Sequence, residues 1–268
     1  MSEPLIEEKA AVGETQLCVL RRGRGQPLLY LHGELGFEGW CQWHEALARK
    51  RTILIPLHPG FGRSQPADWI MDMRDLAAFY SRFIRERKLA PVDVIGFSLG
   101  GWIAAELAAA NSAQLRRMVL VGAAGVRPPQ GEIMDMYTVT ARRFLTRCIR
   151  DPAAAPEFAA LYTAAGAAPQ NQAAAQWEAW EDARAATARI AWKPYMFSQS
   201  MPHLLANVTA LPTLIIWGRQ DEVVPLSAGQ LYHEKIAGSR MVVLDQCGHM
   251  PMIEKSAEFV RAVQDFLE

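Results

Sequence analysis

The stretch Val94-Ile95-Gly96-Phe97-Ser98-Leu99-Gly100-Gly101-Trp102 decides the fold of this chain. It follows an apolar run that begins at Val92 and is typical of a buried strand, and it leads into an Ala-rich run, Trp102 to Ala110, that is typical of a helix. The two glycines of the Gly-x-Ser-x-Gly pattern permit a tight turn, because a Cβ on either would collide across it. We therefore expect Ser98 on a strained strand-to-helix turn, with its hydroxyl pushed out at the sheet edge and the positive end of the helix dipole pointing at it.

Length and composition are those of an ordinary globular protein. The chain has 268 residues, enough for one large domain or one domain with an insertion, and half of them are hydrophobic, so a sizeable core can form. The 28 Lys and Arg residues balance 28 Asp and Glu residues. A net charge near zero argues against nucleic acid or an anionic membrane as a partner, and we expect a small-molecule substrate. The oligomeric state stays open, with a homodimer as one alternative.

The spacing of the cysteines and the length of the apolar runs indicate the cellular compartment and whether a metal is bound. The four cysteines, at positions 18, 41, 148 and 247, lie far apart and match no zinc or redox spacing. The acidic N-terminal stretch has no long apolar core, and no apolar run approaches the ~18 residues of a membrane span. We expect reduced thiols, a cytoplasmic protein, and neither a metal nor another cofactor.

Strand-like and helix-like runs alternate along most of the chain. The expected strands are a hairpin over 5–22 and runs at 27–31, 52–57, 92–97, 115–121, 211–217 and 240–244, with helices at 38–50, 68–88, 102–110, 226–236 and 256–267. This alternation predicts the α/β class, with a mostly parallel sheet covered by helices on both faces. Reactive groups then belong in the loops that leave the carboxyl ends of the strands.

The pattern changes between residues 126 and 206, where no strand signal appears. Three stretches look helical, at 132–150, 153–165 and 171–191, and prolines bound them. The chain therefore divides into residues 1–125, the first part of an α/β core, residues 126–206, an inserted helical subdomain, and residues 207–268, the second part of the core.

Three residues in separate loops form a candidate catalytic set. A serine hydroxyl is a poor nucleophile at neutral pH, so Ser98 needs a base and a group that orients the base. His249 follows the last strand in a Gly-flanked loop, and Asp221 follows the preceding strand. The order serine, acid, histidine is the one expected when the nucleophile sits on such a turn. Asp245 and Glu222 are the alternative acids.

An oxyanion needs two N–H donors aimed at it. Leu99 at the helix start supplies one. The second should come from the loop after the 27–31 strand, and we assign it to Glu34, with Leu35 as the alternative. The Glu34 side chain should turn away or be hydrogen-bonded, because a carboxylate in the site would oppose a developing negative charge. His32 is expected to brace this turn rather than to act in catalysis.

Five motifs in order give the chain a family resemblance: Leu31-His32-Gly33, Pro59 to Ser64, Gly96 to Gly101, Trp217 to Asp221 and Gly248 to Pro251. The chain resembles a cap-bearing α/β-hydrolase of the esterase and C–C hydrolase type over nearly its full length. The resemblance implies an eight-stranded sheet, a helical cap between strands six and seven over residues 126–206, and the triad Ser98, Asp221 and His249.

Departures from the family pattern bear on the substrate. Ser98 argues against dehalogenases and epoxide hydrolases, which use an aspartate nucleophile. C–C hydrolases often have Asn before the serine and Trp after the histidine, where this chain has Phe97 and Met250. His58 replaces the usual Asp before the Pro-Gly-x-Gly loop, and we expect it to be structural. Arginines of the cap could hold a substrate carboxylate.

The leading functional hypothesis is a serine hydrolase that cleaves a carboxylic ester of a small apolar or aromatic substrate through an acyl-enzyme. One alternative is a C–C bond hydrolase that acts on a ring-fission product with the same triad. Another is a ligand sensor that keeps the triad but does not turn over its ligand.

Overall fold

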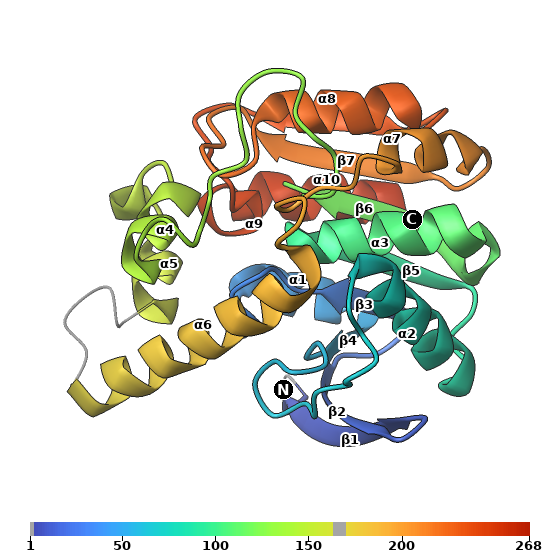
Figure 1. Cartoon of the computed structure of the whole chain (residues 1–268), viewed down its shortest axis with the longest axis horizontal. Helices are drawn as coiled ribbons and strands as arrows, with labels where there is room; N and C mark the ends of the chain where they lie inside the picture. Colours follow the sequence, from blue (N-terminus) through green and yellow to red (C-terminus); the bar gives the residue numbers. More distant parts are fainter. Residues whose placement is uncertain (1–2, 163–169) are drawn as a thin grey trace.

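The computed structural model describes residues 3–162 and 170–268, and within them eight strands form one sheet (Figure 1). The strands are β1 (Ile6–Val12), β2 (Thr15–Arg22), β3 (Gln26–Leu31), β4 (Arg51–Pro56), β5 (Val92–Phe97), β6 (Leu115–Val121), β7 (Thr213–Gly218) and β8 (Arg240–Leu244). Their order across the sheet is β1-β2-β4-β3-β5-β6-β7-β8. The eight-stranded, mostly parallel α/β-hydrolase sheet expected from the sequence is confirmed.

The direction of the strands places the candidate site residues at one edge. β1 and β2 form an antiparallel hairpin and β2 pairs antiparallel with β4, whereas all neighbours from β4 through β8 pair in parallel. The carboxyl ends of β3, β5, β7 and β8 therefore meet at the same edge. Every residue of β5 is buried, as expected for a central strand with helices on both faces.

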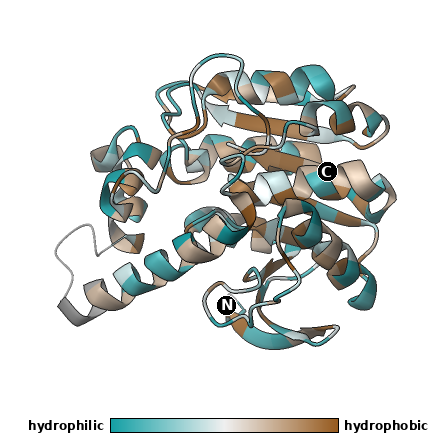
Figure 2. Cartoon of the chain, viewed as in Figure 1, coloured by the Kyte–Doolittle hydropathy of each residue, from teal (hydrophilic) through white to brown (hydrophobic). Residues whose placement is uncertain are grey.

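Helices cover both faces of the sheet. On one face lie α1 (Gln42–Ala48) and α10 (Ser256–Leu267), which contact each other, together with α9 (Pro251–Glu254). On the other lie α2 (Met73–Glu86), α3 (Leu99–Asn111) and α8 (Leu226–Lys235) (Figure 1). Figure 2 shows hydrophobic strands between helices whose outer faces are hydrophilic, so the core lies between the layers.

The segment between β6 and β7 leaves the sheet and forms a cap of α4 (Ala141–Cys148), α5 (Pro156–Leu161) and α6 (Gln170–Ala191), which lies to one side of the sheet in Figure 1. Its two ends are tied together, because Gly125 N–H donates to the Met196 carbonyl and Ser198 N–H donates to the Gly125 carbonyl. The short α7 (Met201–Leu204), placed within 126–206 by the sequence analysis, contacts α8 of the core.

Several helices differ in length from the sequence prediction. A helix was expected over 132–150, but residues 132–140 are irregular and α4 begins only after Thr140, whose Oγ1 accepts the Arg143 N–H as an N-cap. The helix expected at 38–50 begins at Gln42, because Gly39 adopts a φ of 110°. Of the helix expected at 153–165, α5 covers the middle, and residues 163–165 lie outside the described residues.

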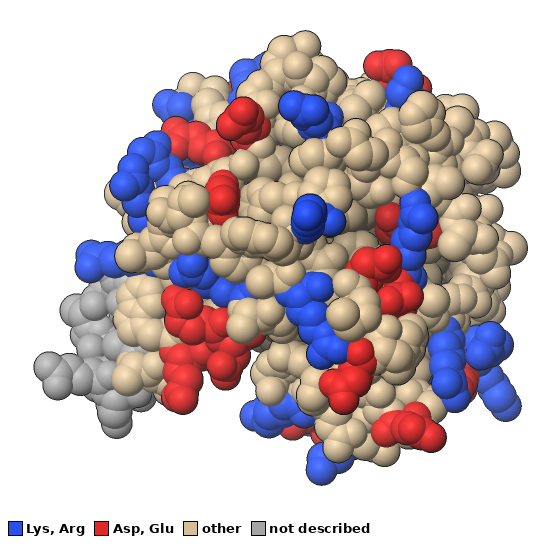
Figure 3. Space-filling view, in the orientation of Figure 1, with Lys and Arg blue, Asp and Glu red and all other residues tan. Residues whose placement is uncertain are grey.

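On the face drawn in Figure 3, groups of basic and of acidic side chains are scattered among uncharged residues, which form most of the surface. Acidic side chains gather over α6, on which Glu178, Glu181 and Asp182 are exposed. No helix in the two described ranges combines the length and apolar character needed to cross a bilayer.

Candidate active site

The turn that carries Ser98 has the strain expected from its sequence. Ser98 has φ 49° and ψ −112°, a conformation that L-residues rarely adopt, and α3 begins at the next residue. A Cβ on Gly96 would lie 2.3 Å from the carbonyl oxygen of Gly100, and one on Gly100 would lie 2.0 Å from the carbonyl oxygen of Leu31. Both glycines are therefore required for β5 to turn directly into α3 beneath the end of β3.

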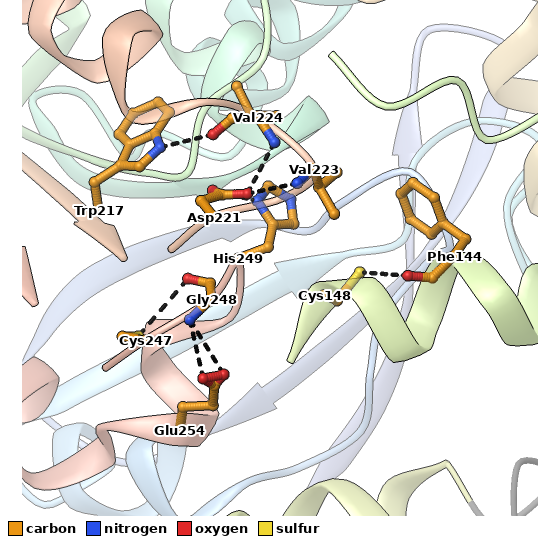
Figure 4. A network of polar contacts seen from close by, with 10 residues as sticks. All are labelled: Phe144, Cys148, Trp217, Asp221, Val223, Val224, Cys247, Gly248, His249 and Glu254. Carbon is orange, nitrogen blue, oxygen red and sulfur yellow. Dashed lines mark hydrogen bonds and ion pairs between the residues drawn. The ribbon is translucent and has the colours of Figure 1, made fainter. Parts of the chain in front are cut away.

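The structure brings Asp221 and His249 into direct contact. His249 Nδ1 lies 2.8 Å from Asp221 Oδ2, and because a carboxylate can only accept, Nδ1–H is the donor. The other oxygen, Asp221 Oδ1, accepts the N–H groups of Val223 and Val224 at 2.8 Å each (Figure 4). Trp217 Nε1–H donates to the Val224 carbonyl and fixes that loop on β7. The carboxylate is thus held by backbone donors with one oxygen facing the imidazole.

The two alternative acids lie elsewhere. Asp245 is exposed and forms an ion pair with Arg219, and Glu222 is exposed and forms an ion pair with Arg147. Neither contacts His249, so the geometry favours Asp221.

His249 lies near the serine turn, but it is not hydrogen-bonded to Ser98 in this structure. Both residues are fully buried, and both Ser98 Oγ and His249 Nε2 have no hydrogen-bond partner in the described part of the chain. The Phe97 ring, next to the serine, lies 5.0 Å from the imidazole, centroid to centroid. Catalytic hydrogen bonds are often unmade without substrate and form on binding. The two free atoms are the donor and acceptor that such a bond would use.

Two opposing effects set the pKa of His249. Burial disfavours the imidazolium and lowers the pKa, but the charge of Asp221 and its hydrogen bond outweigh burial, with a further contribution from the charge of Glu34. The net result is a pKa above the ordinary value of 6.5. This arrangement stabilises the protonated form that a general base passes through.

Two backbone N–H groups close to the serine turn have no hydrogen-bond partner in the described chain. Leu99 and Glu34 donate no backbone hydrogen bond among the described residues. Glu34 lies in a tight turn closed by the Gly36 N–H and the Gly33 carbonyl at 3.1 Å. Thr187 of α6, fully buried, donates its hydroxyl to the Glu34 carbonyl at 2.9 Å. The cap therefore holds the turn that presents one of the two candidate oxyanion donors.

The Glu34 side chain lacks the hydrogen bond that was one of its two expected alternatives. We expected it to turn away or to be hydrogen-bonded, but it is only 3% exposed and no residue of the described chain donates to its carboxylate. Its charge raises the pKa of His249 and of Tyr137, so it lies close to the site. Sequence could not show this, because the direction of a side chain in a tight turn depends on the cap packed over it.

Two neutral histidines, His32 and His58, form hydrogen bonds that hold the turn containing Glu34. His32 Nδ1–H donates to the Gly33 carbonyl, and His58 Nε2–H donates to the His32 carbonyl. The two rings lie 3.7 Å apart, centroid to centroid, and the Tyr80 hydroxyl contacts His58 Nδ1. Burial lowers the pKa of His32 to about 4 and that of His58 well below its ordinary value. Both histidines are structural in this geometry, as expected.

The loop that carries His249 is fixed by residues that sequence reasoning missed. His249 N–H donates to the Cys148 carbonyl at the end of α4. Glu254 accepts the Gly248 N–H (Figure 4). It also accepts the Arg150 N–H at 2.7 Å and so joins this loop to the cap. Glu254 was not singled out from the sequence. Its place in the first turn after the Gly248–Pro251 motif is the feature that could have indicated this contact. In the described ranges, no group of three or more His, Cys, Asp or Glu side chains is arranged to hold a metal ion.

Comparison with known proteins agrees with this architecture. Residues 26–256 match the family described as alpha/beta hydrolase fold. The chain belongs to the α/β-hydrolase family, and it is a hydrolase.

Several individual proteins are similar to this chain in sequence or in structure. The chain is 32% identical over 273 residues to 2-hydroxymuconate semialdehyde hydrolase of Pseudomonas sp. (strain CF600), covering 91% of this chain and 88% of the relative. It is 28% identical to 2-hydroxy-6-oxo-2,4-heptadienoate hydrolase of Pseudomonas putida, covering 91% and 90%. Among solved structures, a bacterial membrane phospholipase A superposes with a TM-score of 0.79 at 23% identity, over 98% of this chain and 86% of that one. That likeness concerns the fold alone.

Proposed function

We propose that this protein is a serine hydrolase that cleaves a carboxylic ester of a small apolar or aromatic substrate through an acyl-enzyme. Ser98 is the nucleophile, His249 the general base and acid, and Asp221 the group that orients it. The observation that carries the proposal is the buried bond of 2.8 Å between His249 Nδ1 and Asp221 Oδ2, at the edge where the strained serine turn ends β5. This arrangement supports acyl transfer.

The proposed reaction follows from where protons can go. His249 Nε2 takes the Ser98 proton as Oγ attacks the substrate carbonyl carbon, and Asp221 stabilises the imidazolium. The Leu99 and Glu34 N–H groups hold the oxyanion. The imidazolium then gives its proton to the leaving alcohol, the C–O bond breaks, and an acyl-serine remains. Water, deprotonated by His249, attacks that ester, and the acid and free Ser98 are released.

A second candidate is hydrolysis of a C–C bond in a ring-fission product. It is supported by the names of the two Pseudomonas relatives and by a cation in the cap. Arg184 of α6 is one turn from Thr187. Its Nη1 pairs with Glu181 and its Nη2 donates to the Val139 carbonyl, but its Nε is buried without a partner in the described chain. This one N–H is left for a substrate carboxylate, the group that a guanidinium binds well. The Glu34 carboxylate opposes an anionic substrate, and for this reason we place the ester first.

Turnover of p-nitrophenyl butyrate tests the proposal. Wild-type protein should turn over this ester continuously, and Ser98→Ala should lose at least 10³-fold in kcat/KM with an unchanged melting temperature. Equal activity of the variant would refute the role of Ser98. One equivalent of covalent acylation without turnover would instead indicate a ligand sensor.

A second assay distinguishes ester hydrolysis from C–C bond hydrolysis. Consumption of a 2-hydroxy-6-oxo-dienoate can be followed by the loss of its visible absorption. If this substrate is cleaved with a kcat/KM far above that of every ester, the C–C bond is the correct assignment. If only esters react, the first proposal stands.

A further inference from the structure

Glu34 is an unusual acid among the buried acids of this protein. Four acids in the described ranges are less than one-tenth exposed: Glu34, Asp93, Glu106 and Asp221. Asp93 contacts the guanidinium groups of Arg51 and Arg116, Glu106 accepts the Trp102 indole N–H, and Asp221 accepts three donors. Glu34 has no donor in the described chain. A buried carboxylate without a partner is costly, so its retention calls for a reason.

None of the donors near Glu34 forms a hydrogen bond with its carboxylate. The charge of Glu34 raises the pKa of Tyr137 and Tyr195, which places both side chains near it. Yet the Tyr137 hydroxyl donates to the Arg184 carbonyl, and the Tyr195 hydroxyl donates to the Met134 carbonyl. Arg184 donates to Glu181 and to the Val139 carbonyl, and its Nε, which has no partner in the described chain, does not bond to Glu34 either. The neighbouring residues therefore leave the carboxylate without a donor.

The Glu34 carboxylate lies close to the groups that the proposed reaction uses. Glu34 lies in the turn whose N–H is a proposed oxyanion donor, and its charge is one of the causes that raise the pKa of His249. A fixed negative charge there disfavours the developing oxyanion and any anionic substrate. A positively charged N–H donor on the substrate would compensate both the charge and the missing hydrogen bond, in a charge-assisted pair.

We propose that the Glu34 carboxylate binds a protonated amine of the substrate and so makes this protein selective for esters with a basic nitrogen near the reacting carbonyl. This inference rests on the proposed serine-hydrolase function and changes its substrate class from a wholly apolar ester to an otherwise apolar ester that carries one basic nitrogen. Glu34 thereby has two parts: its backbone N–H serves the oxyanion, and its side chain selects the substrate.

Isosteric ester pairs test the selectivity on either side of the ester. On the alcohol side, 2-(dimethylamino)ethyl butyrate is compared with 3-methylbutyl butyrate. On the acyl side, methyl 4-(dimethylamino)butanoate is compared with methyl 5-methylhexanoate. For at least one pair, wild-type kcat/KM at pH 7 should favour the amine roughly 10- to 100-fold, as expected for a hydrogen bond to a charged group. Glu34→Gln should reduce that ratio to near one. Because the ratio compares two esters within one variant, a change in the rate of both esters cancels.

Glu106→Gln is the matched control, because Glu106 is also a buried acid but accepts the Trp102 indole N–H and leaves the pKa of His249 untouched. It should keep the amine preference. An amine ratio at or below one for both pairs would overturn the inference, as would a ratio unchanged in Glu34→Gln. Melting temperatures of both variants establish that they fold.

A binding experiment keeps this inference separate from the proposed reaction. Calorimetry of the Ser98→Ala variant compares 5-(dimethylamino)pentan-2-one with its neutral isostere 6-methylheptan-2-one. Tighter binding of the amine, lost in Ser98→Ala/Glu34→Gln, supports the inference even if no ester is cleaved. Equal binding of the two ketones would refute it, whereas the failure of all ester turnover would refute only the proposed function.

Discussion

Replacing Asp221 by asparagine should invert the tautomer of His249 while leaving the shape of the site intact. Asp221 Oδ1 accepts the Val223 and Val224 N–H groups at 2.8 Å each, so only an oxygen can occupy that position. In Asp221→Asn, the amide oxygen therefore stays there and the NH₂ group faces His249. The imidazole must then accept at Nδ1 and carry its proton on Nε2, the atom that has to receive the Ser98 proton.

The expected loss follows from blocking that proton transfer. We expect kcat for p-nitrophenyl butyrate to fall by about 10³- to 10⁴-fold, equivalent to about 4–5.5 kcal/mol at 1.36 kcal/mol per tenfold. Asp245→Asn is the control, because this exposed acid pairs with Arg219 and does not contact His249. It should retain wild-type activity. A loss below tenfold in Asp221→Asn, or an equal loss in Asp245→Asn, would refute the proposed role of Asp221.

Two further predictions concern pH and stability. Because only the neutral imidazole accepts a proton, kcat/KM should fall as the pH drops through the His249 pKa, which lies above 6.5. Glu34→Gln removes a charge that raises this pKa, so it should shift the fall in kcat/KM to lower pH. A kcat/KM that does not change between pH 5 and 8 would count against His249 as the base. Asp93→Ala should lower the free energy of unfolding by about 3 kcal/mol in urea titrations, because it removes the buried carboxylate that pairs with both Arg51 and Arg116. Glu8→Gln, at a partly exposed ion pair, should lower it by less than about 1 kcal/mol. If both substitutions lowered the free energy of unfolding equally, the burial of Asp93 would not explain its contribution to stability.

The local chemistry of the serine turn was readable from the chain because it depends on neighbours in sequence. The spacing of Gly96, Ser98 and Gly100 restricts how a strand can turn into a helix, and the strand-like run before it determines which edge the turn occupies. The same holds for the loops that carry Asp221 and His249, since each follows an apolar strand. Hydrophobic periodicity thus predicted the sheet and the edge at which these three residues gather.

Helix bounds in the cap were less predictable. The stretch 132–150 has the composition of a helix, yet its first part is irregular because Tyr195 accepts the Met136 N–H and donates to the Met134 carbonyl. These bonds come from a residue distant in sequence and outweigh local propensity. Contacts of this kind leave no periodic trace in a single sequence.

By itself, the sequence determined the α/β-hydrolase fold, the strained serine turn and the order of its candidate partners, because short-range sterics and strand periodicity act between near neighbours. Only the tertiary structure decided which acid meets His249, how Thr187 and Cys148 of the cap hold the two reactive loops, and that Glu34 lies buried without a donor. Those outcomes depend on which side chains from distant segments reach the same place. Asp245 and Glu34 are both acids, yet tertiary packing makes the first an exposed ion pair and the second a buried carboxylate without a donor.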